Sequence, residues 1–149
     1  MAVAIWALVP LDGSLSYELG SSHQSRSILS PRHVPLLTSG FAGQQPWGRW
    51  TDRPTATLTF GRPFPRHLVL SLTGHAFGPN IDAPVRVCVP GDCETMRLAA
   101  TDSTVRLTFH AAGAARSVTL HVPHAVSPGN GDPRLLGVGI VSVRVEEAR

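Results

Sequence analysis

Two of the chain's three tryptophans and an arginine lie within the segment Trp47-Gly48-Arg49-Trp50. Indole rings offer flat apolar faces, and a guanidinium group donates several hydrogen bonds in one plane. Together they can stack on the C–H face of a pyranose and hydrogen-bond its hydroxyl groups. The same residues can instead form a buried structural clamp. Trp47 fits either role, whereas Trp50 lies so close to the apolar residues Ala56 and Leu58 that its position is more typical of a core residue.

Further polar candidates lie in two segments that are longer than hairpin connections require, residues 73–84 and 123–137. Binding residues concentrate in long loops carried by a rigid scaffold. In a sugar-binding interpretation, polar side chains of these loops orient the sugar while the indole rings supply apolar contact. The candidate hydroxyl-binding residues are Arg49, Asn80, Asp132 and Arg134.

A structural interpretation of the same polar residues is equally open. In it, the two arginines, Arg49 and Arg134, pair with aspartates beneath the loops, because buried charges are retained only when they are paired. The candidate aspartates are Asp52 and Asp132. Asn80 follows a proline and is also a typical turn-forming residue.

Cys88 and Cys93 flank the turn sequence Val89-Pro90-Gly91-Asp92. Across a hairpin, two such cysteines face each other at a separation that a disulfide can bridge. The loop is short, so the bond would stabilise the fold by less than the ~3 kcal/mol typical of a 15-residue loop. Two free thiols and half of a zinc site are the alternatives, the latter lacking a second pair of ligands.

The elements that must position these residues follow a period of two from Thr55 onward. Apolar residues alternate with threonines, serines and arginines, which is typical of half-buried strands, and no segment sustains a helical period. We therefore predict an all-β fold, an antiparallel β-sandwich of the jelly-roll type. The last strand begins apolar on both faces, which indicates a bulge near Ile140 or a central position. The expected strands lie at 55–60, 68–72, 85–89, 96–98, 105–110, 118–122 and 138–145.

With 149 residues, 42% of them apolar, the chain is expected to form one globular unit. Residues 10–40 carry many Ser, Pro and Gly, and residues 1–38 are predicted to be an irregular lead-in, with a short strand at Leu15, Tyr17 and Leu19. Residues 39–149 are predicted to form the β-sandwich domain. The apolar stretch 2–9 is too short to span a bilayer and lacks the charged flank of a signal peptide, so it fits a strand, a frayed tail or the end of a membrane-proximal segment.

Charge and motif content exclude several classes of function. The net charge is +3, and the thirteen basic residues, all arginines, are dispersed without interleaved aromatics, which disfavours nucleic-acid binding. His110, His121 and His124 lack a carboxylate at a fixed spacing, so we interpret them as solvated surface histidines and expect neither metal nor cofactor. No nucleophile elbow, phosphate-binding glycine loop or close carboxylate pair is present. An enzyme is therefore the weaker hypothesis.

Four motifs in order carry a family resemblance. The chain resembles the C-terminal β-sandwich domain of bacterial membrane-bound phosphoglycerol transferases, and related accessory modules of polysaccharide-modifying glycosyltransferases, over roughly residues 39–147. The resemblance implies a location outside the cytoplasmic membrane, beside enzymes that act on glucans or envelope glycans. It does not extend to the catalytic part of the transferase. The motifs are Gly40-Phe41, Trp47-Gly48-Arg49-Trp50, Ala76-Phe77-Gly78-Pro79-Asn80, and Ser127-Pro128 followed by Asp132-Pro133-Arg134-Leu135-Leu136-Gly137.

The residues and the resemblance together predict a non-catalytic accessory domain that binds or positions envelope glycan for a membrane-bound transferase. The expected location is extracytoplasmic, that is periplasmic, with a membrane tether in the full-length protein. The alternative is a structural or protein-interaction β-sandwich without a sugar site, and a small hydrolase with an unrecognised site is the third hypothesis. The predicted ligand-binding residues are Trp47, Arg49, Trp50, Asn80, Asp132 and Arg134, and the predicted disulfide joins Cys88 and Cys93.

Overall fold

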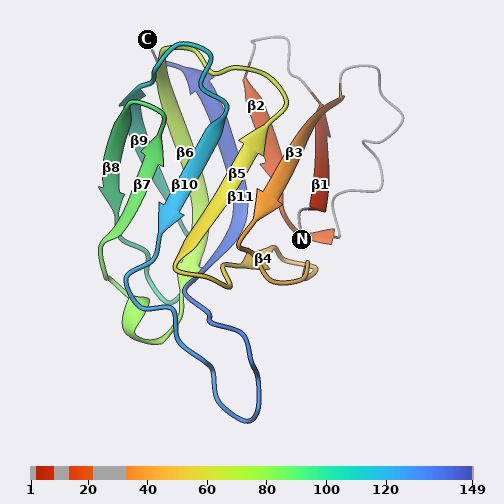
Figure 1. Cartoon of the computed structure of the whole chain (residues 1–149), viewed down its shortest axis with the longest axis vertical. Coiled ribbons are helices and arrows are strands. Elements are labelled where there is room, and N and C mark those ends of the chain that lie inside the picture. Colours follow the sequence, from red (N-terminus) through yellow and green to blue (C-terminus); the bar gives the residue numbers. More distant parts are fainter. Residues whose placement is uncertain (1–2, 9–13, 22–32, 149) are drawn as a thin grey trace.

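The computed structural model describes residues 3–8, 14–21 and 33–148, which form a sandwich of two antiparallel sheets (Figure 1). The chain passes from one sheet to the other at most connections, in the winding of a jelly roll, so the predicted all-β sandwich is confirmed. The first sheet has the order β1 (Val3–Leu8), β3 (His33–Ser39), β5 (Thr55–Phe60), β10 (Ser117–His121), β7 (Val85–Val89) and β8 (Asp92–Met96). The second has the order β2 (Leu15–Glu18), β11 (Val138–Glu147), β6 (His67–Ala76) and β9 (Ser103–His110), and the short β4 (Arg49–Trp50) also pairs with β11.

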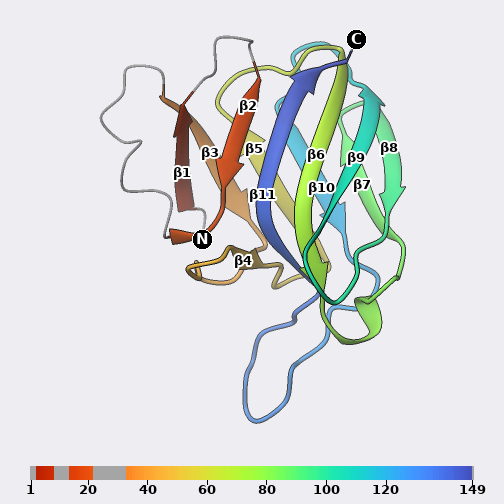
Figure 2. The ribbon, with the colours of Figure 1, turned by 180° about the vertical axis from the view of Figure 1, so that it is seen from behind.

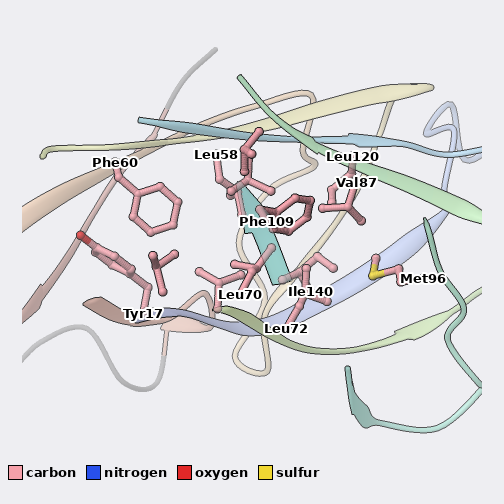
Figure 3. Close-up of a cluster of buried hydrophobic side chains, with 14 of the residues drawn as sticks. Tyr17, Leu58, Phe60, Leu70, Leu72, Val87, Met96, Phe109, Leu120 and Ile140 are labelled. Atoms are coloured by element: carbon pink, nitrogen blue, oxygen red, sulfur yellow. The ribbon is translucent and has the colours of Figure 1, made fainter. Parts of the chain in front are cut away.

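The core lies between the two sheets and is built from the apolar side chains that alternate along each strand (Figure 3). In β5, for example, Ala56, Leu58 and Phe60 are buried while the residues between them are not. Phe60 packs edge to face on Tyr17, with 5.3 Å between ring centroids. Burial raises the pKa of Tyr17 to about 12, against a smaller opposing effect of the Arg62 charge. The alternating pattern thus directs one face of each strand inward.

The predicted irregular lead-in contains strands of both sheets. β2 pairs with β11, placing Tyr17 opposite Val143, and β3 pairs with β5. Tyr17 is 1% exposed and Leu19 is fully buried, because the alternation of Leu15, Tyr17 and Leu19 is the same core-facing pattern as in the later strands. The proposed boundary at residue 39 is therefore not an edge of the sandwich. The parts of this lead-in at 1–2, 9–13 and 22–32 lie outside the described residues.

The apolar stretch near the amino terminus forms β1, which pairs antiparallel with β3 from Val3 opposite Thr38 to Leu8 opposite His33. The sequence left a strand, a frayed tail and the end of a membrane-proximal segment open for this stretch, and the structure shows the strand. Within the described part of the chain, no helix has the length and apolar character needed to cross a membrane.

The last strand has both features that its sequence offered as alternatives, a central position between β2 and β6 and a bulge near Ile140. Along β11, Ile140 pairs with Gly74 but Ser142 already pairs with Thr73, so Val141 is an extra residue in the ladder. Before the bulge, three successive residues, Val138 to Ile140, are buried. β4 pairs with the edge of this stretch, and the rings of Trp47 and His75 cover its outer face at Gly139. The bulge therefore marks the place where the tryptophan segment meets the sheet.

Cys88 and Cys93 are directly opposite each other in the β7–β8 hairpin and form a disulfide, with 4.1 Å between their Cα atoms. Gly91, in the turn between them, has a φ of +95°, a conformation that favours glycine. The Val89-Pro90-Gly91-Asp92 turn thus brings the two sulfurs together.

Candidate functional site

The outer face of the second sheet carries a row of residues from three neighbouring strands. Trp50 in β4 pairs with Gly139 in β11, and Gly139 pairs with His75 in β6. Figure 2 shows β11 and β6 side by side, with β4 at one end of them. Since the middle residue has no side chain, the rings of Trp50 and His75 approach each other over the sheet backbone.

Trp47 completes an aromatic cluster over this row. Its ring centroid lies 5.3 Å from that of Trp50, with 78° between the planes, and 4.7 Å from that of His75. Trp50 and His75 are 4.8 Å apart at 84°, and Trp50 also contacts Phe77 at 6.0 Å. Edge-to-face packing of this kind fixes the orientation of each ring. The cluster is therefore a preformed surface.

Two glycines allow the tryptophan segment to lie flat on β11. A Cβ at Gly48 would be 2.2 Å from the carbonyl oxygen of Ile140, so only glycine lets the loop approach the strand this closely. A Cβ at Gly139 would be 2.5 Å from His75 Nε2 and 2.8 Å from Trp47 Cη2. Both rings thus rest directly on the backbone of β11.

Beside the cluster is a shallow hollow with a volume of about 370 Å³, which we call the tryptophan hollow. At its edge, the Nδ1–H of His75 donates a hydrogen bond of 2.7 Å to Oδ1 of Asp102, because a carboxylate oxygen only accepts. The side chain of Asp102 is 56% exposed and that of His75 is 18% exposed. Two half-buried indole rings and an accessible carboxylate therefore border the hollow together. The hollow is lined by Trp47, Trp50, His75, Ala100, Thr101 and Asp102.

Arg49 points away from this hollow and into the structure. It is 2% exposed, and its Nε and Nη2 donate to the carbonyl oxygen of Ala42 at 2.9 and 2.7 Å. Nη1 donates to the hydroxyl of Thr38 at 2.6 Å, and the guanidinium lies 5.9 Å from the ring centroid of Phe41. Burial lowers the pKa of Arg49. The side chain holds the tryptophan segment to β3, and its partners are a carbonyl and a hydroxyl instead of the expected aspartate.

Asn80 is fully buried and joins two loops. Its Nδ2 donates to the carbonyl oxygens of Phe77, at 3.2 Å, and of His124, at 2.5 Å, and its Oδ1 accepts from the backbone N–H of His124 at 3.0 Å. The residue ends the 3-10 turn η2 (Gly78–Asn80). It therefore fastens this turn to the base of the β10–β11 loop.

Replacing Asn80 with alanine is expected to lower the free energy of unfolding by about 2–3 kcal/mol, because the part-buried backbone N–H and carbonyl of His124 both lose their partner. Urea denaturation measures this loss. The near-isosteric Asn80→Asp should also destabilise, since a carboxylate cannot donate to the two carbonyls. A wild-type midpoint for Asn80→Asp would show that shape alone matters at this position.

Asp132 and Arg134 pair with each other in the β10–β11 loop, which projects from one end of the sandwich (Figure 1). Arg134 Nη2 lies 2.6 Å from Asp132 Oδ2, and Nε contacts both carboxylate oxygens at 3.0 Å. The side-chain hydrogen bond between them lowers the pKa of Asp132 and raises that of Arg134. The two side chains are 27% and 34% exposed and do not line the tryptophan hollow.

The tryptophan segment and the Asp-Pro-Arg segment nevertheless meet at one end of the molecule. The backbone N–H of Leu135 donates to Asp52 Oδ1 at 2.8 Å, and that of Thr51 donates to the carbonyl of Val138 at 2.8 Å. The structure therefore brings these two segments together. Among the six predicted ligand-binding residues, Trp47 and Trp50 line the hollow, whereas the buried or paired side chains of the other four lie elsewhere.

Sequence reasoning missed His75 and Asp102. His75 lies in the 73–84 segment that we singled out for its length, but its neighbours gave no sign of an aromatic contact. Asp102 carried no motif at all. The histidines that we compared for metal binding are not brought together, because β9 and β10 belong to different sheets. His110 instead stacks on His67, with ring centroids 4.5 Å apart.

Comparisons with known proteins give one family and several relatives. The model of a family described as "Domain of unknown function (DUF7024)" matches residues 30–147. Phosphoglycerol transferase I of Salmonella choleraesuis strain SC-B67 is 30% identical over 115 residues, which cover 72% of this chain and 15% of that protein. Phosphoglycerol transferase I of Salmonella typhi is similar to the same extent. The chain thus spans about 15% of the length of these relatives.

Among solved structures, the chain is similar to the CBM36-1 domain of a multidomain xylanase from the hindgut metagenome of Trinervitermes trinervoides, with a TM-score of 0.48 and 13% identity over 78% of this chain and 98% of that one. It is also similar to the second N-terminal cellulose-binding domain of β-1,4-glucanase C from Cellulomonas fimi, with a TM-score of 0.41 and 17% identity over 97% and 92%. The family match extends from β3 to the end of β11 and includes every residue of the tryptophan hollow. The chain therefore belongs to the DUF7024 family.

Proposed function

We propose that this domain is a non-catalytic accessory module that binds or positions envelope glycan for a transferase. The observation that carries the proposal is the tryptophan hollow, which two fixed indole rings and an accessible carboxylate border together. Aromatic faces supply apolar contact with sugar C–H groups, and a few polar groups set the orientation of the sugar. The similarity to phosphoglycerol transferase I supports a glycan-related partner.

In this proposal the residues divide into two groups. Trp47 and Trp50 contact the sugar face, and Asp102 accepts a hydrogen bond from a hydroxyl group. Arg49 and Asn80 act indirectly, because each is buried and holds the chain that carries or borders the hollow. Asp132 and Arg134 serve the neighbouring loop as an ion pair.

We further propose that this domain lies outside the cytoplasmic membrane and that the full-length protein is tethered to that membrane. Its proposed partner is a membrane-bound transferase. The Cys88–Cys93 disulfide supports an oxidising compartment. Because the chain spans 15% of the related transferase, the catalytic part is expected in another segment or another protein.

The proposal is tested by titrating the protein with neutral glucan oligosaccharides and measuring binding by calorimetry and by tryptophan fluorescence. Wild-type protein should bind at least one member of a linkage series, and Trp47→Ala should weaken binding by about tenfold or more, as expected for loss of a central aromatic contact. Arg134→Ala is the matched control, since its side chain lies outside the hollow, and should keep wild-type affinity. Absence of binding by folded wild-type protein across the series would refute a glycan-binding role.

The second candidate is a structural or protein-interaction domain. It is favoured by the mutual packing of Trp47, Trp50 and His75, in which the rings partly fill one another's contact surface. Under this hypothesis, Trp47→Ala lowers stability while wild-type protein shows no response to any glycan. Comparing the unfolding and binding curves of that variant therefore separates the two functions.

A further inference from the structure

We infer that the tryptophan hollow selects neutral glycan and rejects glycan that carries an anionic group at the bound residue. This inference rests on the glycan-binding function proposed above and specifies the class of ligand. Among the residues that line the hollow, Asp102 carries an accessible carboxylate.

Among the described residues, no arginine contacts the accessible carboxylate of Asp102. Its Oδ1 accepts from His75, and no described residue donates a hydrogen bond to its Oδ2. A sugar hydroxyl can donate to such an oxygen. A phosphate or carboxylate group on the ligand can only accept, so it would meet like charge and lose its own hydration without a replacement.

The arginines that could offset this repulsion have other partners. Arg49 lies beneath the tryptophan segment with its donors directed to Ala42 and Thr38. Arg97 donates to the carbonyl oxygen of Asp82. No arginine lines the hollow, and the Nδ1–H of His75 is already directed to the Asp102 carboxylate instead of toward a ligand.

The net charge of the whole chain predicts the opposite preference. At +3, the protein should attract anions weakly. Charges separated by more than about 8 Å are largely screened at physiological ionic strength, whereas a carboxylate in contact distance of the ligand is not. Among the residues that line the hollow, the accessible carboxylate of Asp102 therefore acts most directly on an anionic ligand. For an enzyme that attaches anionic groups to glycans, such a module retains the unmodified acceptor and releases the modified product.

The test compares one neutral glucan oligosaccharide with the same oligosaccharide carrying a phosphate monoester, each titrated calorimetrically into the wild-type domain. The phosphorylated form should bind about fivefold more weakly or worse, as contact between like charges at a protein surface implies. Asp102→Asn should remove most of this difference by raising the affinity for the phosphorylated form. An asparagine side-chain oxygen still accepts from His75, so the imidazole keeps its place.

Glu147→Gln is the charge-matched control. It changes net charge by the same amount at the far end of β11, about 25 Å along the strand from Gly139, and should leave the preference intact. Equal binding of both forms to wild-type protein, or an effect of Glu147→Gln as large as that of Asp102→Asn, would overturn the inference while leaving glycan binding in place. Failure of both oligosaccharides to bind would instead refute the proposed function on which the inference rests.

Discussion

Replacing Arg49 with alanine is expected to lower the free energy of unfolding by about 3–5 kcal/mol. The guanidinium is 2% exposed and makes three hydrogen bonds, two to Ala42 and one to Thr38. Its removal leaves these acceptors buried without donors and also removes the packing of the arginine stem. Urea denaturation followed by circular dichroism measures the change.

Two further variants test whether the hydrogen bonds of the buried guanidinium account for this loss of stability. Arg49→Lys keeps the charge but cannot direct parallel donors to one carbonyl, so an intermediate loss of about 2 kcal/mol is expected. Arg53→Ala, at an exposed position a few residues later, should stay within about 0.5 kcal/mol of wild type. If Arg49→Ala and Arg53→Ala had equal effects, the buried clamp would not be what holds the tryptophan segment.

The second large effect is expected for Gly48→Ala. The added methyl group would lie 2.2 Å from the carbonyl oxygen of Ile140 and 3.0 Å from its carbonyl carbon. Because both are backbone atoms of β11, the loop must move away from the strand. We expect a loss of at least about 2 kcal/mol, in the upper part of the range for overpacked sites. Displacement of the loop also carries Trp47 away from His75, so glycan binding should be lost.

Gly43→Ala provides the control within the same loop. A Cβ at Gly43 meets no atom within 4 Å, and its φ is not positive. Its stability should remain unchanged or rise by up to ~1 kcal/mol, through the lower entropy of the unfolded chain. Thermal unfolding and the oligosaccharide titration should therefore distinguish the two glycine variants. A Gly48→Ala protein with wild-type stability would show that the loop does not depend on its close contact with β11.

The sequence was sufficient to predict the all-β sandwich, and it indicated either a bulge near Ile140 or a central position for the last strand. Both follow from local patterns, since a period of two assigns each residue of a strand to one face, and a break in that period reveals an extra residue. The same logic failed for the segment before residue 39. Its short strand at Leu15 and Tyr17 was visible, but its pairing with β11 depends on residues more than a hundred positions later.

The candidate site required the tertiary structure, because its residues come from segments far apart in the chain. Trp50, His75 and Asp102 become neighbours only through the register of β4, β11 and β6 and the start of β9. Register is set by the packing of whole sheets, so no local spacing encodes it. For Arg49 the sequence permitted both a ligand-binding and a buried position, and the close approach of its loop to β11 places it inside.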